Sequence, residues 1–432
     1  MSELAIHGAQ PIRDEDFPKW PVFDQKELEA VSEVVKSGHW WRYSFGQGLD
    51  FKESVEGPRA HTALFQTEFA KYQGARYGVA CANGTVALDM LVRALDIGPG
   101  MEVIVPAYTY VAGSTCVLQS NAVPVFVDID PNTYNIDPDS VEKAITPNTV
   151  ALIPCHFGGQ VADMDRLIQI ATKHNLMIIE DAAHAHGSRW RDMGAGAIGV
   201  GGTFSFQNAK NMTAGEGGLV TTNDPGIAER IESLSWSGRR KGHPWYEFFE
   251  LGWNARMLEV QAAILRIQLT RLEEQNQKRR ENAAYLSERI KEIEGLDPVI
   301  IDSRAAHYSV HIYMIRYNPD AFHGLSRAKL LEVVNAEGIP AFSGYTHPLY
   351  RNPMFLNKQF YGKQCPLSCG FYNNSIDYAS FAETCPVSER ACDHEAIWLE
   401  HRLFLGSRKD MDSIADAFIK VKDNRTELMR EQ

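Results

Sequence analysis

Short apolar segments alternate with helical segments over the first half of the chain, and this alternation constrains the fold more than any other feature. The apolar segments are short enough for strands and lie at residues 77–81, 103–105, 123–127, 151–154 and 177–180. Between them, apolar residues recur at helical spacing, as at Leu88, Leu91, Val92 and Leu95. Strands separated by helices favour a mostly parallel sheet that is covered on both faces. The sequence therefore predicts an α/β fold.

The pattern changes after Trp253, which predicts a second structural unit. A long helix is expected from about residue 257 to 293, and a helix of this length typically bridges two domains or carries a subunit contact. A smaller α/β unit follows, with a strand near 311–317, a helix over 326–337, a strand near 398–405 and a last helix. We therefore divide the chain into an N-terminal arm (1–23), a large domain (24–270), and the connecting helix with a small C-terminal domain (271–432).

Residues 24–38 carry the signals of an N-terminal helix. Asp24 and Glu27 have capping-box spacing, apolar residues repeat at helical spacing, and Gly38 ends the pattern. Trp40 and Trp41 come next and cannot both face one core. We expect one of them to pack inside and the other to line a cleft or an interface.

The charge and the cysteines disfavour several classes of protein. A formal net charge of −12 over 432 residues argues against nonspecific binding to nucleic acid or to an anionic membrane. No apolar run approaches the length of a membrane span, and the N-terminus has no signal-peptide pattern, so we expect a cytoplasmic protein. The odd number of cysteines, 7, favours free thiols over a disulfide framework. Four of them lie between residues 365 and 392 without paired C-x-x-C spacing, so we expect no metal site there.

Polar residues follow the predicted strands, at the edge of the sheet where open α/β folds bind ligands. Asn83-Gly84-Thr85 opens a helix after the first strand. The free N–H groups and the helix dipole there favour an anion, although an ordinary N-cap explains the same residues. After the second strand, Tyr108 or Tyr110 offers a flat wall to an aromatic ligand or simply packs.

Two later strand ends supply a carboxylate and an amine. Asp181 follows the buried segment 177–180, where a carboxylate is costly unless it pairs with a cation, a metal or a ligand N–H. A metal site of Asp181, His184 and His186 is one interpretation, and pairing of Asp181 with the protonated nitrogen of an aromatic ligand fits equally well. Near residues 203–206 a further strand leads from Ser205 into a loop with a single lysine, Lys210, which is either placed for chemistry or merely solvated.

One glycine motif is misleading. Gly194-Ala-Gly196-Ala-Ile-Gly199 matches the dinucleotide pattern G-x-G-x-x-G. It follows no predicted strand and leads into a strand rather than a helix, so both structural requirements of that motif are missing. We therefore reject nicotinamide binding.

Together the strand ends supply an anion cradle, an aromatic wall, a carboxylate and an amine. This set matches the phosphate, ring face, pyridinium nitrogen and aldehyde of pyridoxal 5'-phosphate (PLP).

Four segments also resemble the DegT/StrS family of sugar and cyclitol aminotransferases. They are S-F-Q-N-A-K-N-M-T-A-G-E-G-G, E-D-A-A-H-A-H-G, N-G-T-V-A-L and W-N-A-R-M-L-E-V-Q-A-A-I, and the resemblance extends from about Trp20 to Val421. It implies a fold type I PLP-transferase (aspartate aminotransferase-like) whose large domain binds the cofactor. It also implies a homodimer with shared active sites. The implied reaction is the transfer of an amino group from glutamate or glutamine to a keto sugar or ketocyclitol.

By position, the resemblance implies a role for each site residue. Lys210 would form the Schiff base with the cofactor, and Asp181 would pair with the pyridine nitrogen. His184 would lie by the ring hydroxyl, where many relatives have glutamine. The other implied cofactor contacts are Gly84, Thr85 and Ser205 at the phosphate, Tyr110 on the ring, and Asn254 at the phosphate of a second subunit.

Several features bear on the substrate. The segment C-P-V-S-E-R-A-C (385–392), followed by Trp398-Leu, resembles the cyclitol branch of the family, which includes scyllo-inosose aminotransferases. The Trp40-Trp41 pair is similar to relatives that make aminohydroxybenzoate, whereas the insertion-like segment 46–57 departs from the family's usual spacing. We expect Trp41, Tyr345 and His347 to contact the substrate.

Two alternative functions stay open. One is a PLP-dependent dehydratase or an aromatising synthase of the aminohydroxybenzoate type. The family's sugar dehydratases carry histidine at the lysine position, so Lys210 favours amino transfer. The other is a noncatalytic PLP-binding regulator, whose colour no amino donor would change.

Overall fold

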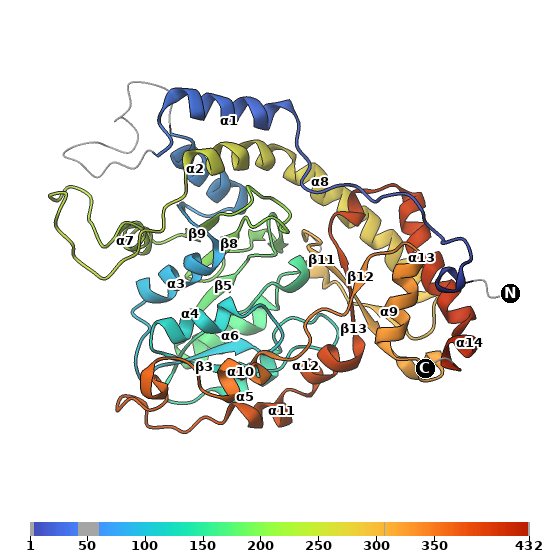
Figure 1. Cartoon of the computed structure of the whole chain (residues 1–432). Coiled ribbons are helices and arrows are strands. Elements are labelled where there is room, and N and C mark those ends of the chain that lie inside the picture. Colours follow the sequence, from blue (N-terminus) through green and yellow to red (C-terminus); the bar gives the residue numbers. More distant parts are fainter. Residues whose placement is uncertain (1–3, 42–59, 306, 431–432) are drawn as a thin grey trace.

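The computed structural model describes residues 4–41, 60–305 and 307–430 (Figure 1). The predicted insertion-like segment 46–57 lies outside these residues.

A seven-stranded sheet forms the large domain, in the order β1-β9-β8-β5-β4-β2-β3. The strands β2, β3, β4, β5 and β8 run parallel, and β9 pairs antiparallel with β8 and β1. Most of their residues are buried, because helices cover both faces of the sheet. This confirms the predicted α/β class. The bounds are β1 (Tyr77–Cys81), β2 (Glu102–Pro106), β3 (Val123–Val127), β4 (Thr149–Leu152), β5 (Met177–Asp181), β8 (Gly201–Ser205) and β9 (Gly218–Thr222).

The helices of this domain connect the strands or flank them. They are α2 (His61–Gln73), α3 (Gly84–Ala94), α4 (Ala112–Gln119), α5 (Pro138–Ala144), α6 (Met164–His174) and α7 (Pro225–Ser235). A two-stranded ribbon of β6 (Arg189–Trp190) and β7 (Met193–Gly194) precedes β8.

A four-stranded antiparallel sheet forms the small domain, in the order β10-β11-β13-β12. Its elements are β10 (Leu296–Pro298), β11 (Ile312–Tyr317), α9 (Arg327–Ala336), β12 (Ala341–Phe342), β13 (Ala396–Glu400), α13 (Arg408–Asp423) and α14 (Arg425–Met429). The strand expected near 398–405 ends earlier, at Glu400, and residues 403–405 form a 3-10 helix, η9.

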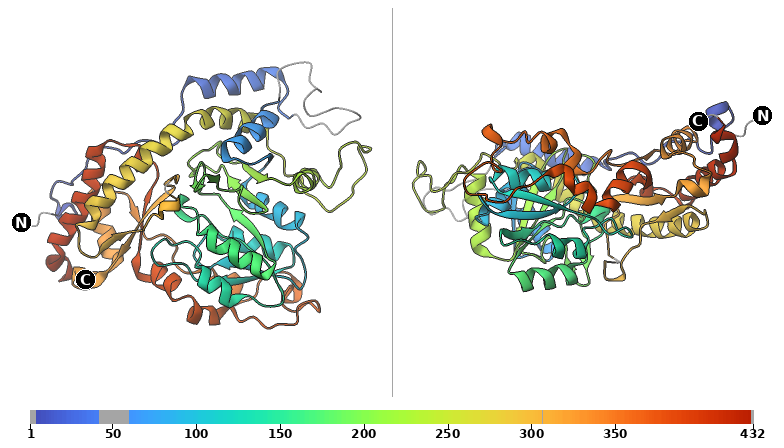
Figure 2. Two further views of the ribbon diagram at one scale, coloured as in Figure 1. Left: turned by 180° about the vertical axis from the view of Figure 1, so that it is seen from behind. Right: turned by 90° about the horizontal axis from the view of Figure 1, so that it is seen from below.

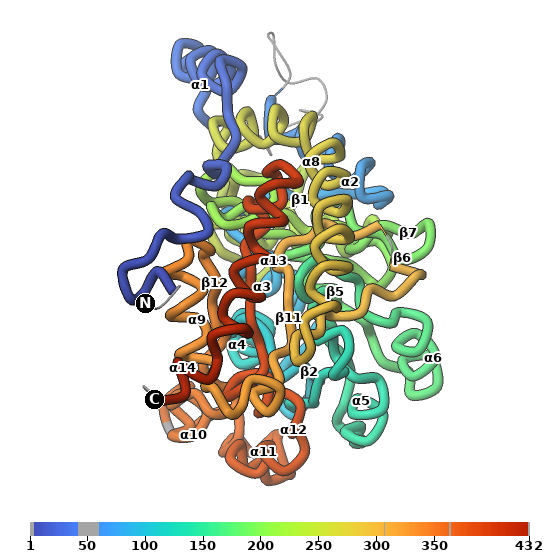
Figure 3. The backbone as a smooth tube through the Cα atoms, turned by 90° about the vertical axis from the view of Figure 1, so that its right-hand side faces the viewer, coloured from blue at the N-terminus to red at the C-terminus, as the bar shows by residue number. Residues whose placement is uncertain are grey.

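Helix α8 (Glu259–Lys291) runs from the core around the large sheet to the core around the small sheet. Its first half places Leu265 and Leu272 in the core of the large domain, and its second half places Leu286 and Ile290 in that of the small domain. Figures 1 and 3 show α8 beside α13 at the small-domain end, and Figure 2 shows both chain termini at that end.

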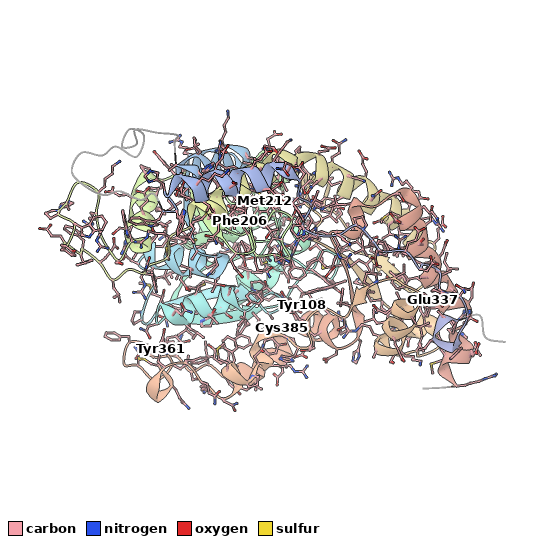
Figure 4. All side chains as sticks on the ribbon, turned by 45° about the horizontal axis from the view of Figure 1, so that its top comes forward. Tyr108, Phe206, Met212, Glu337, Tyr361 and Cys385 are labelled. Carbon is pink, nitrogen blue, oxygen red and sulfur yellow. A yellow bond between two sulfur atoms is a disulfide. The ribbon has the colours of Figure 1, made fainter. Side chains whose placement is uncertain are left out.

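The N-terminal arm is fastened to the small domain. Glu337, a fully buried carboxylate at the end of α9 (Figure 4), accepts hydrogen bonds from the backbone N–H groups of Ala5 (2.8 Å) and Ile12 (3.0 Å). Lys420 pairs with the same carboxylate at 2.7 Å. The arm then leads to Trp20, which reaches the candidate site described below.

Residues from 349 to 385 lie in the predicted small domain by sequence, but many of them pack on the core of the large sheet. Tyr350, Phe355 and Tyr378 contact Phe126 of β3 through their rings. Aromatic side chains between β12 and β13 of the small sheet therefore pack on the large domain.

The cysteines differ in part from the expectation. Cys365 and Cys369 form a disulfide in this returning segment, so the expectation of free thiols is wrong for them. The other five, Cys81, Cys116, Cys155, Cys385 and Cys392, are free and buried. The described helices include none that is both long enough and apolar enough to span a membrane.

Helix α1 (Gln25–Ser37) begins with the predicted capping box of Asp24 and Glu27. Its buried residues are Glu27 and Val34, whereas Leu28 and Val35 are exposed. Glu27 is buried because Arg271 of α8 pairs with it. The expectation that one of Trp40 and Trp41 packs inside is wrong, since both are exposed.

Candidate active site

A cavity of about 770 Å³ opens at the carboxyl ends of the parallel strands, and we call it the sheet-edge cavity. Seven of the predicted site residues line it together, although they come from four separate strand ends of the large domain. They are Gly84, Thr85, Tyr110, Asp181, His184, Ser205 and Lys210. The edge of the sheet therefore brings together what the sequence separates by more than a hundred residues.

The N-terminus of α3 forms one end of this cavity. Asn83 caps the helix and accepts a hydrogen bond from Val86 N at 3.0 Å. The first N–H groups of a helix have no intrahelical acceptor, and Gly84 and Thr85 stand at these positions beside the cavity. A Cβ atom on Gly84 would lie 2.6 Å from Cβ of Ser205, so only glycine allows this close approach. The arrangement suits a phosphate.

Asp181 is the last residue of β5 and lines the sheet-edge cavity. Its side chain is 5% exposed and accepts a hydrogen bond from Ala183 N at 3.1 Å. Burial raises the pKa of Asp181, while the Ala183 hydrogen bond and the Lys210 charge act in the opposite direction. A buried carboxylate of this kind calls for a cationic partner, such as a protonated ring nitrogen.

Lys210 lies in the loop between β8 and β9 and lines both the sheet-edge cavity and a neighbouring one. A hydrogen bond from its backbone N–H to the Gln207 carbonyl (2.9 Å) fixes the turn in which it stands. Burial lowers the pKa of Lys210, and the negative charge of Asp181 opposes that shift. A lowered pKa makes a larger fraction of the amine neutral and nucleophilic at neutral pH.

The second cavity, about 550 Å³, lies between the domains, and we call it the interdomain cavity. Tyr110, His184 and Lys210 line it as well as the sheet-edge cavity. The arm and the small domain supply the rest of its wall, chiefly Trp20, His311, Phe342, Tyr345, Trp398, His401 and Arg402. Tyr108 (Figure 4) lies behind this wall and accepts a hydrogen bond from Trp398 Nε1 at 3.0 Å.

Three buried histidines line the interdomain cavity with their rings close together. The ring centroid of His311 lies 4.2 Å from that of His184 and 5.7 Å from that of His401. Asn211 donates its amide N–H to the Ser309 carbonyl, so its oxygen accepts from Nδ1 of His311 at 2.9 Å. Burial lowers the pKa of all three histidines well below the ordinary value, so they are neutral at neutral pH.

The rejected glycine motif has a structural role. Glu180 is fully buried, and its carboxylate accepts hydrogen bonds from the backbone N–H groups of Gly196 (2.7 Å), Ile198 (2.8 Å) and Gly199 (2.7 Å). His156 Nε2 lies 2.9 Å from the same carboxylate. The motif therefore holds a carboxylate of its own chain.

Three predicted site residues lie outside both cavities. Asn254 is exposed between α7 and α8. The Trp41 ring packs against Trp236 at 5.6 Å. His347 lies near Asn352, with Nε2 at 3.2 Å from the amide oxygen.

The sequence interpretation missed the functional candidates that line the interdomain cavity from the arm and the small domain: Trp20, His311, Trp398, His401 and Arg402. They come from three places in the chain, the arm, the start of β11 and the end of β13, and the sequence signal that included Trp398 pointed to a family branch rather than to a cavity.

The metal interpretation of the strand-end histidines has no geometric support. Within the described parts of the chain, no three His, Cys, Asp or Glu side chains are arranged to hold a metal ion. His186 instead directs Nε2 to the Ser205 carbonyl at 2.9 Å, and burial lowers its pKa to about 3.

The sheet-edge cavity fits a phosphorylated aromatic aldehyde. Gly84 has no side chain to cover the N-terminus of α3, so the N–H groups there are open to a phosphate. Asp181 provides a buried carboxylate, and Lys210 provides an amine. These groups match PLP, the cofactor that the sequence predicts.

Comparison with known proteins agrees with this site. The model of the DegT/DnrJ/EryC1/StrS aminotransferase family matches residues 24–392. The chain is 34% identical to an L-glutamine:2-deoxy-scyllo-inosose aminotransferase of Micromonospora echinospora over 439 residues, covering 99% of this chain and 100% of the relative. The crystal structure of 3-amino-5-hydroxybenzoic acid synthase superposes with a TM-score of 0.82 at 33% identity, covering 95% of this chain and 99% of that one.

A Streptococcus pneumoniae sugar aminotransferase structure in its PLP form superposes with a TM-score of 0.77 at 25% identity, covering 96% of this chain and 100% of that one. The predicted fold, cofactor and enzyme class are thereby confirmed. The chain is a PLP-dependent transaminase and belongs to the DegT/DnrJ/EryC1/StrS aminotransferase family.

Proposed function

We propose that the enzyme transfers an amino group from L-glutamine or L-glutamate to a ketocyclitol or keto sugar. The observation that carries this proposal is the position of Lys210, whose side chain lines both cavities. One cavity has the carboxylate and helix N-terminus that suit the cofactor, and the other has room for a substrate. The relative from Micromonospora echinospora, named for glutamine and an inosose, favours a ketocyclitol as acceptor.

Each residue of the sheet-edge cavity has a distinct task in this proposal. When bound, the cofactor supplies an electron-accepting ring for the chemistry at the substrate carbon. Asp181 would keep the ring nitrogen protonated, and Gly84, Thr85 and Ser205 would hold the phosphate. Tyr110 would contact the ring, and His184 would be the neighbour of its hydroxyl. Lys210 would supply the amine that attaches the cofactor, and the same amine would serve as general base and acid for the substrate proton.

The interdomain cavity supplies the substrate contacts in this proposal. Tyr345 lines that cavity, which supports the predicted role. Trp41 and His347 line neither described cavity, so any contact with substrate would require closure or a second subunit.

We also propose a homodimer with shared active sites. Tyr246 and Leu251, between α7 and α8, are 81% and 76% exposed, and Leu28 and Val35 of α1 add further exposed apolar surface. A second copy of the chain would cover this surface. Asn254 belongs to the same connection between α7 and α8, which projects from the large sheet in Figure 1, and it forms an isolated bridge with Trp236. Light scattering should give the mass of two chains, and Y246D/L251D should shift it toward one. A monomeric wild-type protein would contradict the proposal.

Absorbance of the purified protein tests amino transfer. The protein should carry the absorbance of bound PLP, and L-glutamine or L-glutamate should change that spectrum. Lys210→Ala should remove turnover, whereas Lys173→Ala, which changes a surface pair with Glu142, should not. An unchanged spectrum with both donors, or full activity of Lys210→Ala, would refute the function.

The likeness to 3-amino-5-hydroxybenzoic acid synthase supports a second candidate, an aromatising reaction with the same cofactor. Mass spectrometry of the product separates the two. An aminated cyclitol or sugar supports amino transfer, and an aromatic amino acid supports the synthase.

A further inference from the structure

The loop that carries Lys210 is held by parts of the chain outside the large sheet. The indole N–H of Trp20, in the N-terminal arm, donates to the Asn208 carbonyl at 2.8 Å. Nε2 of His401, the residue after β13, lies 3.0 Å from the Ala209 carbonyl. Asn208 and Ala209 are exposed and directly precede the lysine. The arm and the small domain therefore fix the backbone on one side of Lys210.

The residue on the other side of Lys210 is held in the same way. The side chain of Asn211 donates to the Ser309 carbonyl at 2.6 Å and lies 2.9 Å from Nδ1 of His311 through its oxygen. Ser309 and His311 directly precede β11 of the small domain. Hydrogen bonds from outside the large sheet therefore flank the lysine on both sides.

Arg279 of α8 orients both groups that hold the preceding residues. Arginine can only donate, so Nδ1 of His401 accepts from Nη2 of Arg279 at 3.3 Å, and Nε2 carries the proton that is donated to the Ala209 carbonyl. The guanidinium carbon lies 5.3 Å from the centre of the Trp20 ring, within cation–π range. The rings of Trp20 and His401 meet edge to face at 4.6 Å. One buried side chain therefore fixes the direction of both donors.

The arm that carries Trp20 is anchored just before it. Arg13 pairs with Asp410 of α13 at 2.6 Å, and Arg402 donates to the Pro18 carbonyl at 3.3 Å. Both contacts tie the arm to the small domain. The indole is therefore presented to the loop by a fixed backbone.

A loop that is already held favours attachment of a ligand to it. A covalent bond to a lysine on a loose loop costs the conformational freedom of that loop, whereas a fixed loop loses little. Trp20 and His401 also line the interdomain cavity, so direct contact with a ligand is the competing interpretation. The two interpretations differ in one respect, because only positioning of the loop acts through the Lys210 side chain.

We propose that Trp20 and His401 are positioning residues for Lys210, and that they present its amine to the cofactor by holding the two residues before it. This inference rests on the proposed attachment of PLP to Lys210. It adds that the arm and the small domain, which lie outside the sheet-edge cavity, contribute to the affinity for PLP.

A double-mutant cycle with Lys210 tests this inference. Trp20→Phe removes the indole N–H but keeps an aromatic ring beside Arg279, and PLP is titrated into the PLP-free protein with absorbance as the signal. With Lys210 present, Trp20→Phe should raise the dissociation constant of PLP about 2- to 10-fold, the range for a neutral hydrogen bond. In a Lys210→Ala background PLP binds without attachment, and Trp20→Phe should leave the dissociation constant unchanged.

Two further variants identify the hydrogen bond as the cause. His401→Leu should weaken PLP binding only when Lys210 is present, and His401→Gln, whose amide N–H can still donate to the Ala209 carbonyl, should recover part of the loss. Tyr285→Phe is the matched control. It removes one donor from an aromatic ring on the same helix as Arg279, the bond to Asp412 at 2.7 Å, and lines neither cavity, so its PLP affinity should equal that of the wild type.

The outcomes separate this inference from the proposed function. Equal losses of PLP affinity in Trp20→Phe with and without Lys210 would overturn the inference, because they would indicate direct contact or a general structural defect. Unchanged affinity in Trp20→Phe with Lys210 present would also overturn it. If Lys210→Ala alone kept the wild-type affinity and the wild-type spectrum, the attachment of PLP to Lys210 would be refuted, and with it the proposed function.

Discussion

Replacing Glu180 by glutamine should destabilise the large domain severely, although Glu180 lines neither cavity. Four donors converge on this fully buried carboxylate. Ile198 N and Gly199 N bond to Oε1, and Gly196 N and His156 Nε2 bond to Oε2. The proton on Nε2 is fixed, because Nδ1 of His156 accepts from Ala162 N at 3.2 Å.

The cost follows from counting acceptors. Glutamine keeps one oxygen, which can satisfy two of the four donors, and its NH₂ group then faces the other two. Each buried donor left without an acceptor costs about 1–3 kcal/mol, so the total is about 2–6 kcal/mol. This is a large part of the stability of an ordinary domain, about 5–15 kcal/mol.

Urea denaturation of Glu180→Gln and wild type, followed by both circular dichroism and tryptophan fluorescence, measures the difference. Glu142→Gln makes the same chemical change in an exposed pair with Lys173 and should leave the midpoint unchanged. A loss for Glu180→Gln below about 0.5 kcal/mol, the usual range for surface substitutions, would refute the reasoning.

Three further predictions concern the cofactor site, acid stability and the thiols. Gly84→Ala would place its Cβ 2.6 Å from Cβ of Ser205, and overpacking of this kind costs about 1–3 kcal/mol; a titration should show weaker PLP binding, and unchanged affinity would contradict the geometry. Burial lowers the pKa of His186 to about 3 in the folded protein, so below about pH 6.5 only the unfolded chain takes up this proton. Unfolding free energy should therefore fall as the pH drops from about 6.5 toward 3, and urea midpoints of His186→Gln should fall less steeply; equal slopes would argue against a neutral buried His186. The denatured, unreduced protein should react with a thiol reagent at 5 cysteines and the reduced protein at 7, whereas 7 in both would exclude the Cys365–Cys369 disulfide.

The parts of the site on the parallel strands could be predicted because they depend on local pattern. A parallel strand is buried on both faces, so its sequence is a continuous apolar run, and the polar residues around its carboxyl end are the candidates for the ligand-binding edge. This reasoning led to Thr85, Tyr110 and Asp181. Helical periodicity, in contrast, does not tell which face meets the core, so the exposed side of α1 was unforeseen.

The wall of the interdomain cavity could not be predicted from the sequence. Trp20, His311 and Arg402 come from the arm and from two strand ends of the small domain, and only tertiary packing brings them together. Each looks like an ordinary residue in its own segment. The sequence likewise does not show that Arg279 of α8 is fully buried, because that helix is rich in charged residues.

Glu180 and Asp181 show why a strand end with two carboxylates has two different functions. Successive side chains of a strand point to opposite faces of the sheet, so only one of the pair can reach the sheet-edge cavity. Glu180 turns to the other face, where hydrogen bonds from three backbone N–H groups and His156 offset the cost of burying its carboxylate. Asp181 accepts one backbone hydrogen bond, from Ala183 in its own turn, and this single bond does not offset the burial of its charge. Its carboxylate therefore still calls for a cation. Because its neighbour is fixed by four donors, the strand end cannot rotate to relieve Asp181, and in the function that we propose a ligand with a protonated nitrogen is the partner that satisfies it.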